Sequence, residues 1–162
     1  MRRGYDGAKK IVGRKRVELC DMSGNLLEAV VVSADTDERV CALCVLAKAK
    51  KGAWSANLQT IFCDSGFAGE EFEAQVLWQF GWKLEIVRRD KEQVGFVVLP
   101  KRWLIEQLFG CQGRNRRLAR DYEQNHNISR ATLQAVNVHR WLRRLKPAPT
   151  TDPPLYPKRN PL

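Results

Sequence analysis

The sequence predicts an α/β fold in which a mixed sheet is flanked by helices. Two observations carry this prediction. Extended and helical patterns alternate along the chain in the order hairpin, helix, strand, helix, strand, helix, which is typical of layered α/β domains. The run LLEAVVVSA at residues 26–34 is nearly continuous apolar sequence, as expected of a strand that is buried on both faces.

The N-terminal residues 1–16 hold seven Lys or Arg against one acid, and glycines punctuate them. This composition predicts a basic loop or arm that could run along phosphates. A short strand is then expected at residues 17–20 and a second strand at residues 26–33. The turn residues Asp21, Gly24 and Asn25 between them favour a hairpin.

A helix is expected next, because Asp35 and Glu38 resemble an N-terminal capping arrangement. Its apolar positions at helical spacing are Val40, Leu43, Cys44 and Ala47. Cys41 and Cys44 form a CxxC pair, but no second CxxC or CxxxH follows at a useful distance. We therefore interpret these cysteines, Cys44 included, as core rather than as zinc ligands or a redox pair.

The remaining elements alternate to the end of the domain. A strand is expected at 58–63, a helix at 69–80 with Phe72, Val76 and Phe80 on one stripe, and extended segments at 83–87 and 95–99. A helix around 103–109 carries Ile105, Leu108 and Phe109 as its apolar stripe, and a last helix runs from Ser129 to Arg144. Residues 1–145 are thus one domain. Residues 146–162 hold six of the seven prolines and are predicted to be a disordered tail.

The net charge indicates the class of binding partner, and the cysteine count indicates the redox state of the compartment. The net charge is +10 and the pI is about 9.7, which favours nucleic acid first and acidic lipid second, although a basic surface without a specific partner stays open. No apolar run approaches the ~18 residues that a membrane span needs. Five cysteines, an odd number, argue against a disulfide framework and fit a reducing compartment. We expect a cytoplasmic protein, associated with the nucleoid when bound to DNA.

Two acids stand at informative positions. Asp64 directly follows the expected strand 58–63, and sites in open α/β sheets form beyond the carboxyl ends of strands. The alternative is a turn-forming Asp before Gly66. Glu106 is the one acid of the basic stretch 99–118. It is either a metal-binding or acid/base carboxylate, or a solvated acid paired with Arg102 one turn earlier.

A series of motifs brings these acids together. The motifs follow one another in the order GYDGAKKIVGRKR, VELCDMSGNLLEAVVVSA, IFCDSGFAGEEF, FGWKLEIVRR, GFVVLPKRWLIEQLF and GRNRRLARDYE. From Arg3 to Leu145 this series resembles the C-terminal half of bacterial insertion-sequence DDE transposases, which have a ribonuclease-H-like catalytic domain. The resemblance implies a ribonuclease-H-like mixed sheet. It also implies that Asp64 is the second catalytic acid and Glu106 the third, with Arg102 matching a basic residue of the same signature.

The implied chemistry is Mg²⁺-dependent phosphoryl transfer on DNA, which needs hard oxygen ligands around two divalent ions. In the family, the first catalytic Asp lies on a central strand upstream of the GYDGAKK motif, and no acid of this sequence matches it. Phe67 stands where Tyr is common, and Gln107 where Arg is frequent. The sequence therefore predicts an incomplete sheet without its first central strand, in which Asp64 and Glu106 bind Mg²⁺ weakly or not at all.

The implied function is that of a truncated transposase, whose family activity is DNA cleavage and strand transfer, and which is inactive alone. The alternative is a non-catalytic basic DNA-binding remnant or a partner of an intact transposase; an unselected gene product is a third. We also expect an isolated chain to fold poorly or to self-associate. The predicted DNA contacts are Lys9, Lys10, Arg14, Lys15, Arg16, Lys101, Arg102, Arg114, Arg116, Arg117 and Arg120.

Overall fold

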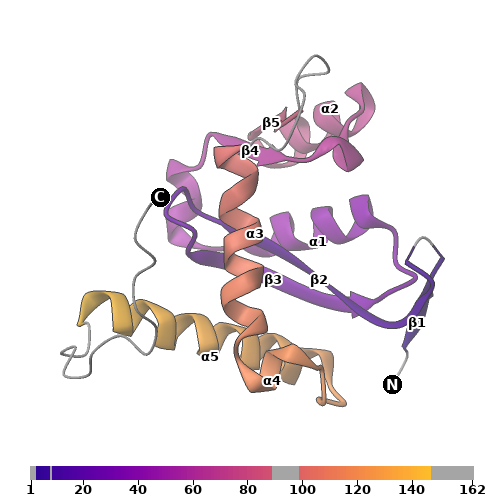
Figure 1. The fold of residues 1–162 in the computed structure, drawn as a ribbon. Coiled ribbons are helices and arrows are strands. Elements are labelled where there is room, and N and C mark those ends of the chain that lie inside the picture. Colours follow the sequence, from indigo (N-terminus) through magenta and orange to yellow (C-terminus); the bar gives the residue numbers. More distant parts are fainter. Residues whose placement is uncertain (1–2, 8, 89–98, 147–162) are drawn as a thin grey trace, which may run out of the picture.

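The computed structural model describes residues 3–7, 9–88 and 99–146, and it has the expected mixed α/β architecture (Figure 1). Strands β1 (Gly4–Asp6), β2 (Ile11–Cys20) and β3 (Leu26–Ser33) form an antiparallel sheet in that order. Strands β4 (Thr60–Cys63) and β5 (Lys83–Ile86) form a parallel pair. The helices are α1 (Glu38–Ala49), α2 (Glu70–Phe80), α3 (Pro100–Gly113), α4 (Arg116–Ala119) and α5 (His126–Leu145), with short 3₁₀ turns at Ala53–Asn57 and Ser65–Phe67.

Among the described residues, no backbone ladder joins the three-stranded sheet to the β4–β5 pair. Both nevertheless contribute to one hydrophobic core, with Val30 of β3 and Ile61 of β4 buried in the same cluster. Helices α1 and α2 supply Val45, Phe72 and other buried side chains to this cluster. The division into two sheets around one core agrees with an incomplete ribonuclease-H-like sheet.

The expectation of a basic arm at residues 1–16 is wrong. Gly4 of β1 pairs with Gly13 of β2, and β2 is a strand of ten residues that begins at Ile11. Cations are tolerated here because β2 alternates its faces. Val17 and Leu19 pack against the main core, whereas the Arg16 guanidinium donates to the Leu118 carbonyl oxygen at 2.9 Å. The composition indicated a loop because the acceptors of these cations lie far away in sequence.

The expected apolar stripe of α1 is wrong, because Val40, Cys44 and Ala47 are exposed. The buried residues are Cys41, Val45, Leu46 and Ala49. Cys41 is therefore core as expected, but Cys44 is exposed, so its interpretation as core is wrong. The helix is capped by Asp37, whose carboxylate accepts from the amides of Arg39 and Val40, and not by Asp35. Val45, Leu46 and Ala49 belong to the main core, so packing against the sheet selects the buried face of α1.

A second, smaller core joins β3 to the C-terminal helices. Its buried members are Leu26, Ala29, Leu108, Leu118 and Leu133. On α3 the expected stripe is therefore correct at Leu108, but Phe109 is exposed. The far end of α5 is held to the β2–β3 turn, where the Arg140 guanidinium donates to the Gly24 carbonyl oxygen at 2.8 Å.

The other elements are close to the expectation. Strand β3 has the expected bounds, and α2 buries Phe72, Val76 and Phe80 as predicted. Strand β4 starts two residues late, and α5 starts three residues early because the Asn125 side chain caps it. The extended segment expected at 95–99 lies outside the described residues except for Leu99, and so does the proline-rich tail after Lys146.

Candidate active site

Asp64 lies where the sequence analysis expects it, directly after β4. Its side chain is exposed, and its Oδ1 atom accepts a hydrogen bond from the amide of Gly66 at 3.0 Å. Asp64 therefore caps the 3₁₀ turn Ser65–Phe67, which is the turn-forming role that its position before Gly66 allows. One carboxylate oxygen is engaged in this cap. The cap fixes the direction in which the carboxylate leaves the strand.

Helix α3 is seated on the β4–β5 pair by its first turn. The Nζ atom of Lys101 lies 3.6 Å from the ring centroid of Phe62 and 3.3 Å from Oε1 of Glu85. Phe62 and Glu85 are paired neighbours in the parallel ladder, so one lysine touches both strands close to their carboxyl ends. The elements that carry the two predicted catalytic acids are thus in contact (Figure 1).

Glu106 is exposed on α3, and its Oε1 atom accepts from Nε of Arg102 at 2.9 Å. This is the i,i+4 ion pair that the sequence allows as the plain structural role of Glu106. Both side chains are about half exposed, so the pair contributes little to stability. That Glu106 and Asp64 face one cleft stays a prediction.

Sequence reasoning missed a third carboxylate near Asp64. A Cβ atom placed on Gly66 would meet Asp64 Oδ1 at 3.1 Å and Glu38 Oε2 at 3.8 Å. Glu38 belongs to the first turn of α1, and the sequence indicates only a capping role for it. No local pattern relates Glu38 to Asp64, because tertiary packing of α1 beside the end of β4 brings them together.

The donor chemistry of Asp64 and Glu106 fits Mg²⁺, since both offer exposed carboxylate oxygens. In the part of the chain that the structure describes, however, no three His, Cys, Asp or Glu side chains are grouped to hold a metal ion. Cys63 is no substitute ligand. Burial raises the pKa of its thiol to about 12, and the neighbouring Asp64 carboxylate adds to the effect, so the thiol stays protonated near neutral pH.

The predicted DNA-contact residues divide into two groups. Those with exposed side chains are Lys9, Lys10, Lys101, Arg102, Arg114, Arg116, Arg117 and Arg120. The three strand residues Arg14, Lys15 and Arg16 are instead engaged inside the protein. The Arg14 side chain is only 7% exposed, with Nε 3.3 Å from Asp121 Oδ2, and the Lys15 ammonium donates to the Thr36 carbonyl oxygen at 2.8 Å.

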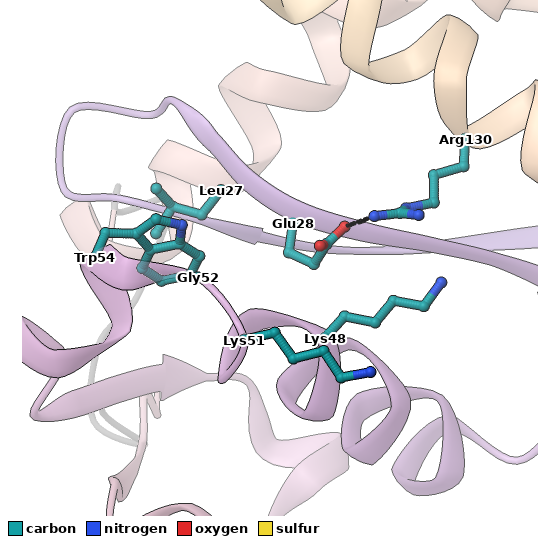
Figure 2. Close-up of a pocket in the computed structure, with 7 residues that line it drawn as sticks. All are labelled: Leu27, Glu28, Lys48, Lys51, Gly52, Trp54 and Arg130. Atoms are coloured by element: carbon teal, nitrogen blue, oxygen red, sulfur yellow. Dashed lines mark hydrogen bonds and ion pairs between the residues drawn. The ribbon is translucent and has the colours of Figure 1, made fainter.

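A second basic region, which the sequence did not indicate, surrounds an open cavity of about 440 Å³ (Figure 2). Lys48 and Lys51 reach into it from the end of α1, and Arg130 enters from α5 on the opposite side. The Arg130 guanidinium is paired with Glu28 Oε1 at 2.8 Å, and the indole of Trp54 lines the other end. The cavity has the cations and the aromatic ring that nucleic-acid sites use, but on a different face from α3.

The comparison with known families identifies the class of protein to which this fold belongs. The model of the transposase DDE domain family matches residues 1–138. The chain therefore belongs to the DDE transposase family. No curated protein and no solved structure gave a match. Within the described ranges, no helix is long and apolar enough to cross a membrane.

Proposed function

We propose that the chain acts in DNA transposition as part of a DDE catalytic domain, with Asp64 and Glu106 as two of its acidic metal ligands. The observation that supports this most directly is the contact of Lys101 with both Phe62 and Glu85. This contact packs the helix of Glu106 against β4, the strand that directly precedes Asp64. Family membership supports a transposition-related function and divalent-metal dependence.

In this proposal the acidic side chains of the region would bind metal, and the basic side chains would bind DNA or position the helix. Mg²⁺, when bound, supplies activation of the attacking oxygen and stabilisation of the leaving oxygen. Asp64 and Glu106 would offer the oxygen ligands, and the turn at Gly66 would keep the Asp64 carboxylate in place. Arg102, one turn from Glu106, would bind a DNA phosphate once its ion pair with Glu106 is broken. Lys101 positions the helix, since the ring of Phe62 and the carboxylate of Glu85 hold its ammonium.

Two carboxylates are a weak ligand set for two metal ions, so a further acid is needed. The family resemblance assigns it to a strand upstream of the GYDGAKK motif. Glu38 is the candidate among the described residues, because its carboxylate approaches Gly66 as Asp64 does. We expect residues 1–162 alone to bind divalent ions weakly and not to cleave DNA.

The test is a Mn²⁺ titration of the protein followed by electron paramagnetic resonance, with parallel samples of Asp64→Asn and Glu106→Gln. Each substitution should weaken Mn²⁺ binding by at least about tenfold, because each removes a charged oxygen ligand. Glu71→Gln is the matched control, since it removes an exposed carboxylate of α2. Mn²⁺ binding that ignores both substitutions would contradict the assignment of the acids.

The same titration separates the candidates for the further acid. If Glu38→Gln weakens Mn²⁺ binding as much as Asp64→Asn does, Glu38 completes the site in this chain. If Glu38→Gln has no effect, Glu38 is not the further acid, and adding a strand with an Asp should raise the Mn²⁺ affinity.

The alternative is a DNA-binding role without catalysis. It is favoured by the partners that both acids already have, the Gly66 amide for Asp64 and the Arg102 guanidinium for Glu106. In this role both substitutions would leave Mn²⁺ binding unchanged while DNA binding persists. A supercoiled plasmid incubated with Mg²⁺ or Mn²⁺ would then stay intact under every condition.

A further inference from the structure

Helix α5 has two faces that differ in their surroundings. On the inner face, Ser129, Leu133 and Asn137 are buried at intervals of four residues, and Leu133 belongs to the second core. This face holds the helix to the molecule. The outer face should be polar if it met only water, because surface helices carry charged and polar residues on the side away from the core.

The outer face is instead an apolar stripe, which we call the outer seam. It consists of Ile128, Ala131, Ala135, Val138, Leu142 and Leu145. All six side chains are exposed, and Leu142 and Leu145 are 60% and 82% exposed. The intervals are three, four, three, four and three residues, which is the spacing of the a and d positions of a coiled coil. In Figure 1, α5 lies at the lower margin of the molecule.

The positions that flank the seam fit a partner helix. In coiled coils the e and g positions line the contact, and like charges there repel. Here those positions within the helix are Asn127, Thr132, Gln134, His139 and Trp141, none of which carries a fixed charge. Arg143 and Arg144 lie outside the seam and its flanks, and Arg144 is bonded to Asn25 Oδ1 at 2.7 Å. The seam therefore has an apolar centre with uncharged flanks within the helix, and Lys146 occupies the next e position just past its end.

The order of large and small residues selects the partner. The N-terminal half of the seam holds the two alanines, and the C-terminal half holds the bulkier Val138, Leu142 and Leu145. Two antiparallel copies of the helix would place Ala131 opposite Leu142 and Ala135 opposite Val138. Each small side chain then meets a larger one, which fills the layer without a void. Two parallel copies would set alanine against alanine and leave gaps.

Charge supports the same arrangement. The C-terminal end of α5 carries Arg143, Arg144 and Lys146, so parallel pairing would bring six cations of two copies together. Antiparallel pairing separates the two ends by about 30 Å along a helix of 20 residues, which is more than the ~8 Å Debye length at physiological salt.

We propose that the outer seam is a homodimer interface, in which α5 packs antiparallel against α5 of a second copy of this chain. The proposal is independent of whether Asp64 and Glu106 bind metal. Other occupants are outcomes of the test below, among them residues 147–162 of the same chain.

The experiment is sedimentation equilibrium of the full chain over a range of concentrations in about 0.5 M NaCl, where DNA that could bridge two copies is released. The chain should be in a concentration-dependent monomer–dimer equilibrium. Val138→Asp and Leu142→Asp should each weaken dimerisation on the order of a hundredfold or more, because each change occurs twice in the dimer and removes buried apolar area. Both positions are exposed in the monomer, and a far-ultraviolet circular dichroism spectrum would check that the variants stay folded.

The matched control is Leu77→Asp, since Leu77 is 56% exposed on α2 but lies outside the seam. This variant should dimerise as the parent does. Association that is equal in the parent and both seam variants would overturn the proposal, because strand edges or another surface would then be responsible. A parent chain that stays monomeric would also overturn it. If that monomer dimerises only after residues 147–162 are removed, the tail is the occupant.

Orientation is tested by disulfide formation in a Cys44→Ser background, which removes the exposed thiol. An equimolar mixture of Ala131→Cys and Leu142→Cys chains should give the crossed disulfide as the main product. Ala131→Cys alone should form little dimer under the same mild oxidation. Efficient cross-linking of Ala131→Cys with itself would overturn the antiparallel arrangement in favour of a parallel one.

Discussion

The affinity of this protein for DNA should fall about a thousandfold between 50 and 200 mM salt, if about six phosphates are neutralised on binding. The exposed arginines of the α3–α4 region and the net charge of +10 provide the cations for this contact. Each neutralised phosphate releases condensed counterions, and so the logarithm of the affinity falls linearly with the logarithm of the salt concentration. The measurement is fluorescence anisotropy with a labelled duplex at several salt concentrations.

Replacing Arg114, Arg116, Arg117 and Arg120 with Ala should make the logarithm of the affinity depend less steeply on the logarithm of the salt concentration. The decrease in slope should correspond to the loss of about three to four phosphate contacts. The expected loss is smallest at Arg117, because this residue is already paired with Glu123 at 2.6 Å. Sequence preference should be unchanged, since phosphate contacts position the protein without reading bases. A salt-independent affinity would contradict the prediction and make the charge a solubility feature.

Two further variants locate the DNA on the molecule. Arg14→Ala removes a cation that was predicted to contact DNA but is ion-paired with Asp121 inside the protein. It should lower the free energy of unfolding and leave the salt slope of the folded protein unchanged, because breaking a buried pair leaves the other charge uncompensated. Lys48→Ala with Lys51→Ala removes two cations of the cavity in Figure 2. A flatter slope in this variant would place DNA on that face instead.

The fold could be predicted from sequence where one local pattern dominated. The β-branched run of β3 and the Phe72, Val76, Phe80 stripe of α2 each specify their element without help from distant residues. Strand β2 could not be predicted in full. Its Arg14 and Arg16 are compatible with a sheet because Arg14 forms an ion pair with Asp121 and Arg16 donates to the Leu118 carbonyl oxygen. Both partners are about a hundred residues away in sequence.

The same distinction applies to the candidate site. The position of Asp64 after a strand follows from local sequence, and so does the Arg102–Glu106 pair on one helix face. The seating of α3 through Lys101 on Phe62, and the approach of Glu38 to Gly66, depend on tertiary packing. The outer seam was also missed, because a stripe of apolar residues on a helix predicts a buried face. On α5 that stripe is exposed, and the buried positions are Ser129, Leu133 and Asn137.

Stability should fall as the pH rises through about 7, because of Glu18 on β2. Burial raises the pKa of its carboxyl from 4.5 to about 7, against the smaller lowering effects of a hydrogen bond from Gln112 and of the Arg16 charge. The Gln112 amide donates to Glu18 Oε2 at 2.6 Å, whereas Oε1 is buried without a hydrogen-bond partner among the described residues. The folded protein therefore binds a proton that the unfolded chain has already released at neutral pH.

The sign of the effect follows from linkage. Where the folded state holds more protons than the unfolded state, the free energy of unfolding decreases with rising pH. The contribution of Glu18 is fully present below pH 4.5 and is lost as the pH rises through 7. A shift from 4.5 to about 7 corresponds to a loss on the order of 3 kcal/mol, a large part of the stability of a typical small domain.

Glu18→Gln should remove this loss, because a glutamine is neutral at every pH and its carbonyl oxygen can still accept from Gln112. Urea unfolding at pH 5 and pH 8 should show a smaller pH dependence in the variant than in the parent, with the variant the more stable at pH 8. Glu71→Gln is the control, since it removes an exposed carboxylate and should leave the difference unchanged. Gln112→Leu should increase the pH dependence, because it deletes the hydrogen bond that favours the ionised carboxylate. If the free energy of unfolding changes equally with pH in the parent and in Glu18→Gln, the prediction is contradicted. Water would then reach the Glu18 carboxylate between β2 and α3.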